Sequence, residues 1–274
     1  MRHTLVLRSP PPLRVDARAL LPALLCTMDR EAVLRLPLPQ GRDSVPVGEW
    51  FDVTAEARDD ASPSLRLAGD LSRFDCLGAG MAAGELVVQG DAGDCAGLGL
   101  SGGALRIEGS ARDLAGCAMG GGTLEVQGDV RDFAAGALPG AMDGMSGGML
   151  VVHGRAGARL ADRMRRGTVV VHGDAGDFLA SRMVAGTVAV GGRAGAHAGY
   201  GMRRGSLVMA AGASSVELPA TFVPALGAAD VFWQLLARDL ARHGGPFAGL
   251  AQRRIERHLG DLSADGKGEI LIAG

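Results

Sequence analysis

The sequence predicts an all-β dominated protein: a right-handed parallel β-helix of about seven to eight coils with a small N-terminal α+β cap and C-terminal helices. The first supporting observation is a repeat in which segments that each open on a glycine follow one another every 19 residues, with one exception. A fixed period of this kind indicates stacked structural units. The segments open at Gly84, Gly103, Gly122, Gly148, Gly167, Gly186 and Gly205.

The second observation is the apolar pattern inside each segment. The second and fourth positions after the opening glycine are large and apolar, as at Leu86 and Val88, and this alternation is the period of a strand. A Met or Leu recurs three residues before each glycine, from Met81 to Met202, and a small residue recurs eight residues after it. Three inward-facing ladders predict three short faces per coil. The glycines then occupy corners, where positive φ is often needed, and we interpret the methionines as packing filler.

Residues 1–63 lack the repeat, and we interpret them as an α+β cap that covers the first coil. Repeat rods need such caps because their open strand edges otherwise pair with other chains. The expected elements are strands at 3–8 and 33–38, a helix at 15–25 with Asp16 as its N-cap, and a turn with a strand at 45–53.

Residues 64–218 form the predicted rod. Leu65 and Leu67 match the strand ladder of the following segment, so residues 64–83 are expected to be an imperfect first coil. The one long spacing, from Gly122 to Gly148, exceeds the period by seven residues and indicates an insertion near 139–145.

The outward-facing strand positions change character along the rod. Arg106 and Glu125 stand one coil apart and are expected to form an exposed pair, which contributes little stability. Further along, the outward position is apolar and must be covered. Two coverings stay open: the chain's own C-terminal segment or a partner subunit. We call the apolar outward-facing positions the apolar stripe, which consists of Val151, Val170, Ala189 and Val208.

Residues 219–274 form the predicted C-terminal helical segment and tail. The spacing predicts a helix over 228–243 with one apolar face, strong enough to lie along the apolar stripe. A Gly-Gly-Pro sequence ends that helix, a second, basic helix is expected over 246–259, and a strand is expected near the end of the tail. The apolar face is expected to hold Val231, Phe232, Leu235, Leu236 and Leu240.

Composition and cysteine usage exclude several classes of protein. The formal net charge of −2 gives no global signal for nucleic acid. No basic start followed by a continuous apolar run is present, so we expect no signal peptide, no membrane span and a cytoplasmic protein. The cysteines show no metal-ligand spacing and are expected to be reduced, mostly buried thiols. They are Cys26, Cys76, Cys95 and Cys117.

No set of residues predicts a catalytic, cofactor or metal site in this chain. His153 and His172 stand one coil apart, but no acidic or thiolate ligand accompanies them at metal spacing. The segment 97–102 matches GxGxxG, yet a strand rather than a helix follows it, so we exclude a dinucleotide site. Four aspartates recur at one repeat position and are typical of turns rather than of acid–base pairs. They are Asp94, Asp113, Asp132 and Asp177.

Two MRRG sequences place pairs of arginines on one edge of the rod, two coils apart. This edge is either a solvated corner or a surface for an acidic partner or a polyanionic substrate tail. We call these residues the arginine edge, and they are the candidate binding residues of the chain: Arg165, Arg166, Arg203 and Arg204.

The glycine-led repeat resembles the C-terminal β-helix domain of the glutamate synthase large subunit. It resembles more closely the C-subunit family of formylmethanofuran dehydrogenase. The segment before the repeat, GEWFDV at 48–53, looks like the GDLFEV-like start of that family's helix. The tail from Gly260, with GD followed by GKGEI, looks like the family's closing sequence. The resemblance covers nearly the whole chain.

The resemblance implies one of two settings. In methanogenic archaea this subunit belongs to a molybdenum or tungsten formylmethanofuran dehydrogenase. In methylotrophic bacteria it belongs to a formyltransferase/hydrolase complex of formaldehyde oxidation and one-carbon metabolism, which lacks that redox chemistry. That complex moves the formyl group from formyl-tetrahydromethanopterin to a methanofuran-type carrier and hydrolyses it to formate. The dominance of arginine over lysine favours the bacterial setting.

By the same resemblance the chain is expected to be a non-catalytic scaffold subunit. The implied partners are a formyltransferase subunit, an amidohydrolase-like subunit and a dehydrogenase-B-like subunit, with no nucleic acid and no membrane. The carrier and a catalytic metal belong to those partners, and the arginine edge is expected to meet an acidic partner or the carrier's glutamate-rich tail. The alternatives are the archaeal enzyme or a glutamate-synthase-like module that braces a channel. A hexapeptide acyltransferase is discounted because the period is 19.

Overall fold

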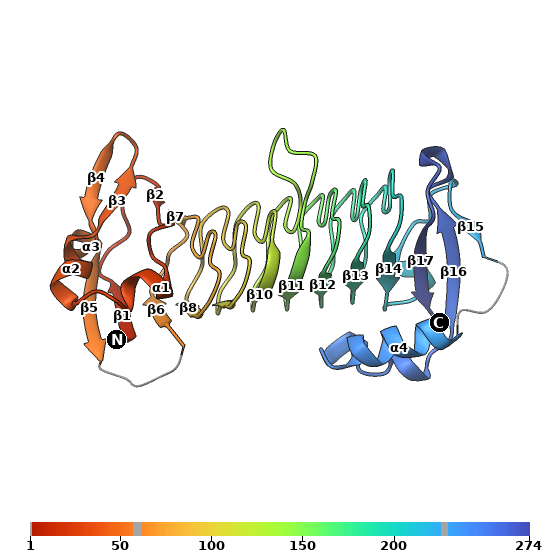
Figure 1. Ribbon diagram of the computed structural model, residues 1–274. Coiled ribbons are helices and arrows are strands. Elements are labelled where there is room, and N and C mark those ends of the chain that lie inside the picture. The colour runs from red at the N-terminus through yellow and green to blue at the C-terminus, as the bar shows by residue number, and fades with distance from the viewer. Residues whose placement is uncertain (1, 57–61, 226–229) are drawn as a thin grey trace.

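The computed structural model describes residues 2–56, 62–225 and 230–274. Figure 1 shows a rod of stacked coils with a folded cap at each end and the two termini at opposite ends. Most of the regular structure is strand, and the helices are few and short. This agrees with the predicted all-β dominated fold. One 13-stranded sheet runs through both caps and the rod.

The rod strands lie one repeat apart and pair in parallel. Leu65 lies beside Leu86, Leu86 beside Leu105, and Leu105 beside Leu124, so the predicted strand ladder and the first coil are confirmed. Successive coils therefore stack identical positions on one another. The rod strands are β6 (Ser64–Ala68), β8 (Glu85–Gln89), β9 (Ala104–Ile107), β10 (Gly120–Val126), β11 (Gly147–Val152), β12 (Thr168–Val171), β13 (Thr187–Val190) and β14 (Ser206–Met209).

The two other predicted ladders also face inward. The Met and Leu side chains from Met81 to Met202 are fully or almost fully buried. Isolated parallel bridges connect the small residues from coil to coil, from Ala92 to Ala194. The opening glycines all have positive φ, and at Gly103 an added Cβ would lie 2.5 Å from the carbonyl oxygen of Gly84. The corners therefore need glycine for conformation and for close approach.

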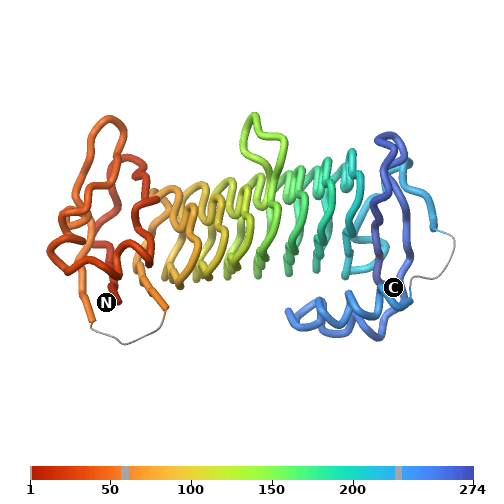
Figure 2. The backbone as a smooth tube through the Cα atoms, viewed as in Figure 1, coloured from red at the N-terminus to blue at the C-terminus, as the bar shows by residue number. Residues whose placement is uncertain are grey.

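The predicted insertion is the one large irregularity of the rod. Figure 2 shows the loop between β10 and β11 rising from an otherwise regular stack. We call residues 137–146 the insertion loop.

The N-terminal cap adds its own strand to the stack. Strand β1 (Arg2–Leu7) pairs in parallel with β6 and antiparallel with β5 (Phe51–Glu56), which confirms the strand expected at 3–8. The strand expected within 45–53 corresponds to the first residues of β5, from Phe51. The other cap elements are β3 (Pro37–Gln40), β4 (Asp43–Pro46) and α3 (Val47–Trp50).

Two expectations for the cap are wrong. The helix expected over 15–25 is reduced to α1 (Pro22–Leu25), because strand β2 (Val15–Asp16) pairs with β7 (Phe74–Asp75) at a coil corner. Most of the strand expected at 33–38 is helix α2 (Arg30–Arg35). The carboxylate of Asp29 caps that helix by accepting the N–H of Ala32 at 2.7 Å.

The C-terminal tail ends in a strand, as expected. Strand β17 (Gly268–Ala273) pairs in parallel with β14 in the register of the repeat. The second helix expected over 246–259 is wrong. Two short 3₁₀ turns, Gly245–Phe247 and Leu250–Gln252, lead into strand β16 (Ile255–Gly260), which pairs antiparallel with β17. Pairing with β15 and β17 overrides the local helical spacing. The remaining elements are β15 (Val223–Pro224) and the 3₁₀ turns Ala213–Ser215 and Leu262–Ala264.

Helix α4 (Asp230–Ala241) confirms the first C-terminal helix; residues 228 and 229 lie outside the described residues. It lies along the rod (Figure 1), and Trp233, Ala237 and Leu240 pack on the apolar stripe at Val170, Ala189 and Val208. The chain's own C-terminal segment thus covers these stripe residues.

The predicted apolar face of this helix is only partly right. Leu240 is buried and Leu236 is partly buried, but Val231 is 77% exposed and Leu235 is 64% exposed. The helix is rotated so that Trp233 points inward, where its indole N–H donates to the carbonyl of Arg253 at 3.0 Å. No described helix is both long and apolar enough to cross a membrane.

Candidate functional site

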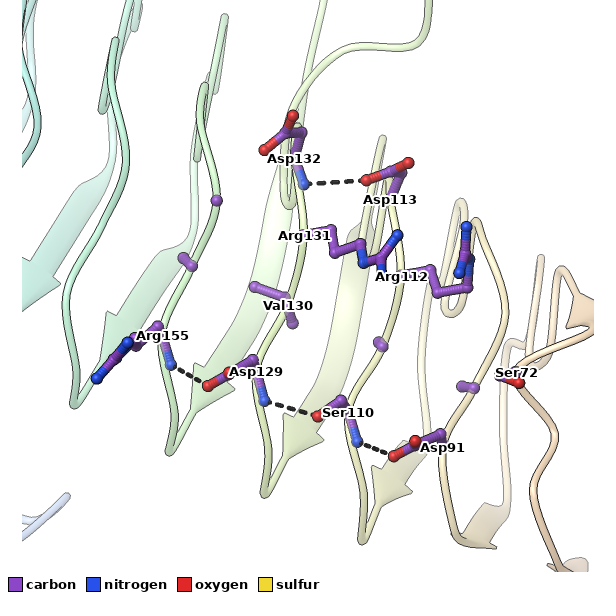
Figure 3. Close-up of a pocket in the computed structure, with 14 residues that line it drawn as sticks. Ser72, Asp91, Ser110, Arg112, Asp113, Asp129, Val130, Arg131, Asp132 and Arg155 are labelled. Carbon is purple, nitrogen blue, oxygen red and sulfur yellow. Dashed lines mark hydrogen bonds between the residues drawn. The ribbon is translucent and has the colours of Figure 1, made fainter.

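The aspartates of the repeat tie neighbouring coils together. The carboxylate of Asp132 accepts the backbone N–H of Ala158, and that of Asp177 accepts the N–H of Ala196, both at 2.8 Å. This confirms their interpretation as turn residues. A second such ladder, at Asp91 and Asp129, lines a depression of about 660 Å³ on the same side of the rod (Figure 3). These carboxylates stabilise the stack because each bonds the backbone of the next coil.

The two stacked histidines belong to the contact between rod and C-terminal segment. The rings of His153 and His172 stack with centroids 4.6 Å apart. His153 Nε2 lies 2.9 Å from the carboxylate of Glu125, and His172 Nε2 lies 3.0 Å from the carbonyl oxygen of His243. Among the described residues, no group of three or more His, Cys, Asp or Glu side chains is arranged to hold a metal ion.

Glu125 bonds to His153 and Gln127, whereas the sequence predicts Arg106 as its partner. Burial raises the pKa of Glu125, but the hydrogen bond from His153 and the charge of Arg106 outweigh burial. The pKa of Glu125 therefore lies below its ordinary value. Arg106 and Glu125 therefore attract each other by charge, without the direct pair that the sequence predicts.

Cys76, Cys95 and Cys117 are poor nucleophiles because the pKa of each of these thiols is raised. Cys76 and Cys117 are buried, and burial raises the pKa of Cys95 to about 11 and that of Cys117 to about 12. Because the thiolate is the reactive form, thiols with such pKa values react slowly at neutral pH.

The arginine edge surrounds one surface depression. All four of its side chains are exposed, and together with Ser146, Val184 and Ala185 they line a hollow of about 670 Å³. The corners are held in place because the backbone N–H groups of Arg165 and Arg203 each donate to the preceding coil at 2.8 Å. The structure thus brings together the four residues that the sequence singles out.

The arginine edge carries little neutralising charge. Arg165 lies 3.0 Å from the carboxylate of Asp143 in the insertion loop. Within the ranges that the structure describes, Arg166, Arg203 and Arg204 have no carboxylate within 4.0 Å. Unpaired guanidinium groups in a hollow favour an anionic occupant, because arginine binds carboxylate and phosphate groups in a fork geometry.

A ladder of side chains on another corner has no counterpart in the sequence prediction. Phe133, Arg159, Phe178 and His197 recur 11 residues after the opening glycine, and all have positive φ. The guanidinium of Arg159 stacks over the rings of Phe133 and Phe178, 5.7 and 4.7 Å from their centroids. In the sequence, only their constant distance of 11 residues from the opening glycine indicates this ladder. The four positions hold different residue types, so the pattern is hard to recognise.

Comparison with known proteins gives both partial and full-length relatives. No family model matches the chain. The C subunit of molybdenum-containing formylmethanofuran dehydrogenase 1 from Methanothermobacter marburgensis is 31% identical over 93 residues, which is 34% of this chain and 23% of that relative. The corresponding protein from Methanosarcina barkeri is 32% identical over 82 residues, 30% of this chain and 27% of the relative. The matched region is thus a minor part of these curated relatives.

A solved structure matches over the full length. It is a chain of the formyltransferase/hydrolase complex from Methylorubrum extorquens, determined by X-ray crystallography in complex with methylofuran. The sequences are 39% identical, the match covers 99% of both chains, and the TM-score is 0.89. Together with the glycine-led rod and the tail strand β17, these relatives show that the chain belongs to the family of formylmethanofuran dehydrogenase C subunits.

Proposed function

We propose that this chain is the scaffold subunit of a bacterial formyltransferase/hydrolase complex. The observation that carries the proposal is the match to the chain from Methylorubrum extorquens, with 39% identity over 99% of both chains. The matches to the molybdenum enzymes are shorter, at 34% of the chain or less.

In this proposal the complex transfers a formyl group from formyl-tetrahydromethanopterin to a methanofuran-type carrier and then hydrolyses it to formate. The crystal structure of the related complex contains methylofuran, a carrier of the proposed kind. Formyltransferase, amidohydrolase-like and dehydrogenase-B-like subunits supply the reaction centres, the carrier site and the catalytic metal.

This chain contributes shape and contact surface rather than chemistry. The repeat aspartates are engaged in bonds between coils, and burial holds the pKa of the Cys95 and Cys117 thiols far above neutral. We infer that the rod, residues 64–218, is a right-handed parallel β-helix between caps at 1–63 and 219–274. Right-handed crossovers between parallel strands are the general rule. The arginine edge is its proposed contact with an acidic partner or with an acidic tail of the carrier.

A component of the molybdenum- or tungsten-containing enzyme is the second candidate, because the curated relatives are subunits of molybdenum-containing dehydrogenases. Both candidates make the chain part of a one-carbon complex, and they differ in the partner subunits.

The two candidates can be distinguished by a mild affinity purification of the tagged native protein. Mass spectrometry then identifies the partner subunits, and a formate-release assay on formylated carrier measures the activity. We expect recovery of a formyltransferase and an amidohydrolase-like subunit, and formate release by the assembly but not by this chain alone. Molybdenum- or tungsten-containing partners would replace the proposal by the second candidate. Activity of the isolated chain, or its recovery alone, would contradict the scaffold function.

A further inference from the structure

Three neighbouring depressions follow one side of the rod and share lining residues. The hollow of the arginine edge, about 670 Å³, shares Arg165, Val184 and Arg203 with a second hollow of about 530 Å³. The second shares Met142, Arg163 and Arg182 with a third of about 520 Å³ beneath the insertion loop. We call this continuous surface the corner groove. It runs from the insertion loop past the turn at 262–264 of the C-terminal cap.

The groove has a small apolar floor between basic walls. Val184 and Ala185 occupy the repeat positions of Arg165 and Arg166, one coil later, and the second arginine pair follows after one more coil. With coils about 4.8 Å apart, the arginine pairs stand roughly 9.6 Å apart. That gap accommodates one extended polypeptide segment between two rows of guanidinium groups.

The acids inside the groove are already engaged. Asp143 pairs with Arg165 at 3.0 Å. Asp162 is buried, receives two N–H groups of Arg182, and lies 3.8 Å from Arg163. Asp113 and Asp132, at the end beneath the insertion loop, each accept a backbone N–H of the following coil. Six arginines and four aspartates line the groove, so its net charge is positive and is concentrated at the arginine edge. A bound segment must carry carboxylates opposite that edge.

The end beneath the insertion loop is apolar and offers an anchor point. Phe133, Leu138 and Pro139 line the third depression, and Met142 at its rim is 74% exposed. Tyr200, which is 56% exposed, lines the adjacent stretch of the groove. Arg, Tyr and Met are enriched at protein–protein interfaces, and clustered anchors of this kind contribute most of the binding energy. The insertion loop also interrupts an otherwise regular stack (Figure 2).

We propose that the corner groove binds an extended acidic segment of another subunit, with one apolar side chain of that segment seated beneath the insertion loop. The inference rests on the proposed function, because it requires an assembled complex. A protein segment fits better than a nucleic acid, since the chain has a net charge of −2 and one end of the groove is apolar. The carboxylates of the segment satisfy the arginine edge, and the anchor fixes its register.

Site-specific photocross-linking in the purified native complex tests where the segment lies. A photoreactive phenylalanine analogue replaces Met142 or Tyr200, and in a control it replaces the exposed Leu13 of the N-terminal cap. We expect both groove positions to cross-link to one peptide of a partner subunit that is rich in Asp and Glu, and the control not to reach it. Cross-links only within the chain, to a peptide without acids, or to nucleic acid would overturn the proposal.

A charge reversal tests the chemistry of binding. We expect the double variant Arg166→Glu/Arg204→Glu to lower retention of the cross-linked partner at least tenfold in a pull-down at fixed salt. The matched control is Arg155→Glu/Arg193→Glu, which makes the same change of charge on another edge. Equal retention by both variants, or equal loss, would overturn the inference. Absence of any partner from the unaltered protein would instead count against the proposed function itself.

Discussion

Single corner residues set how closely two coils approach. At Phe133, Arg159 and Phe178 the chain takes φ values of 61°, 57° and 58°, which side chains rarely adopt. Their backbone N–H groups donate to the next coil at 2.9, 2.7 and 2.8 Å, so the stack holds them in this conformation. At the opening glycines the same conformation coincides with a contact to the preceding coil, and no side chain fits there.

Two glycine substitutions separate conformation from contact. Gly103→Ala places a Cβ 2.5 Å from a carbonyl oxygen, whereas Gly99 has positive φ and open space around it. Ala118, one repeat after Gly99, already tolerates a φ of 53°. We expect Gly103→Ala to cost about 2–4 kcal/mol and Gly99→Ala about 1 kcal/mol or less, read as shifts of the thermal midpoint. Equal shifts would show that contact at the corner is unimportant.

The contact of His243 with the rod predicts a pH dependence of stability. Burial lowers the pKa of His243, the neighbouring His172 and His153 lower it further, and Asp239 opposes them. A folded pKa below the unfolded value of about 6.5 means that the unfolded chain binds the proton more readily. The contribution is therefore present above about pH 6.5 and is lost as the pH falls through the folded pKa.

The measurement compares thermal midpoints of the wild type and His243→Gln between pH 7.5 and 5. The wild type is expected to lose more stability over this range than the variant, whose backbone carbonyl still faces His172. Parallel curves would contradict the assignment.

At the scale of elements, the repeat made the rod strands predictable and non-local pairing limited the rest. The ladder through Leu86 and Leu105 gives strand, register and inward face from the sequence alone. Residues 255–260 carry no such signal, because their strand forms through pairing with β15 and β17. Helix α4 was predictable, but its rotation was not, since Trp233 points inward to reach the carbonyl of Arg253.

The arginine edge shows the same limit at the candidate site. The spacing of the two MRRG sequences places four arginines on one edge, and the structure groups them around one hollow. The groove continues through the fold of the insertion loop and the turn at 262–264, and no period in the sequence relates those segments to the repeat.

The orientation of helix α4 leads to a stability prediction. Trp233→Ala removes a buried ring and its hydrogen bond from the cover of the apolar stripe, so we expect a loss of about 3–5 kcal/mol. Leu235→Ala on the exposed face of the same helix is expected to cost less than about 0.5 kcal/mol. Thermal unfolding and hydrogen exchange of residues 230–241 provide the readout. The reverse order of effects would mean that the helix packs on its other face.

At the scale of the whole molecule, both caps close the sheet in the same way. Strand β1 extends the parallel stack at one end and β17 at the other, and each is then followed by an antiparallel strand. An antiparallel partner ends the stacking of coils and keeps the rod from pairing end to end with another rod.

Ending the chain after Arg254 tests this closure. The truncation removes β16 and β17 and leaves the outer edge of β14 unpaired, so we expect higher oligomers or aggregates in size-exclusion chromatography with light scattering. Leu262→Ala, in the exposed turn between the two strands, serves as a control that keeps both of them. A truncated chain that stays the same size as the control would show that the strand edge needs no cover.

The parallel stack from β6 to β17 fixes the distance between the two caps. The distance between the two caps grows in steps of one coil, about 4.8 Å for each added repeat. Duplicating the repeat at 167–185 would therefore lengthen the rod by one coil. It would also increase the distance between the two arginine pairs by one coil. A partner that contacts both arginine pairs would then have to span one more coil.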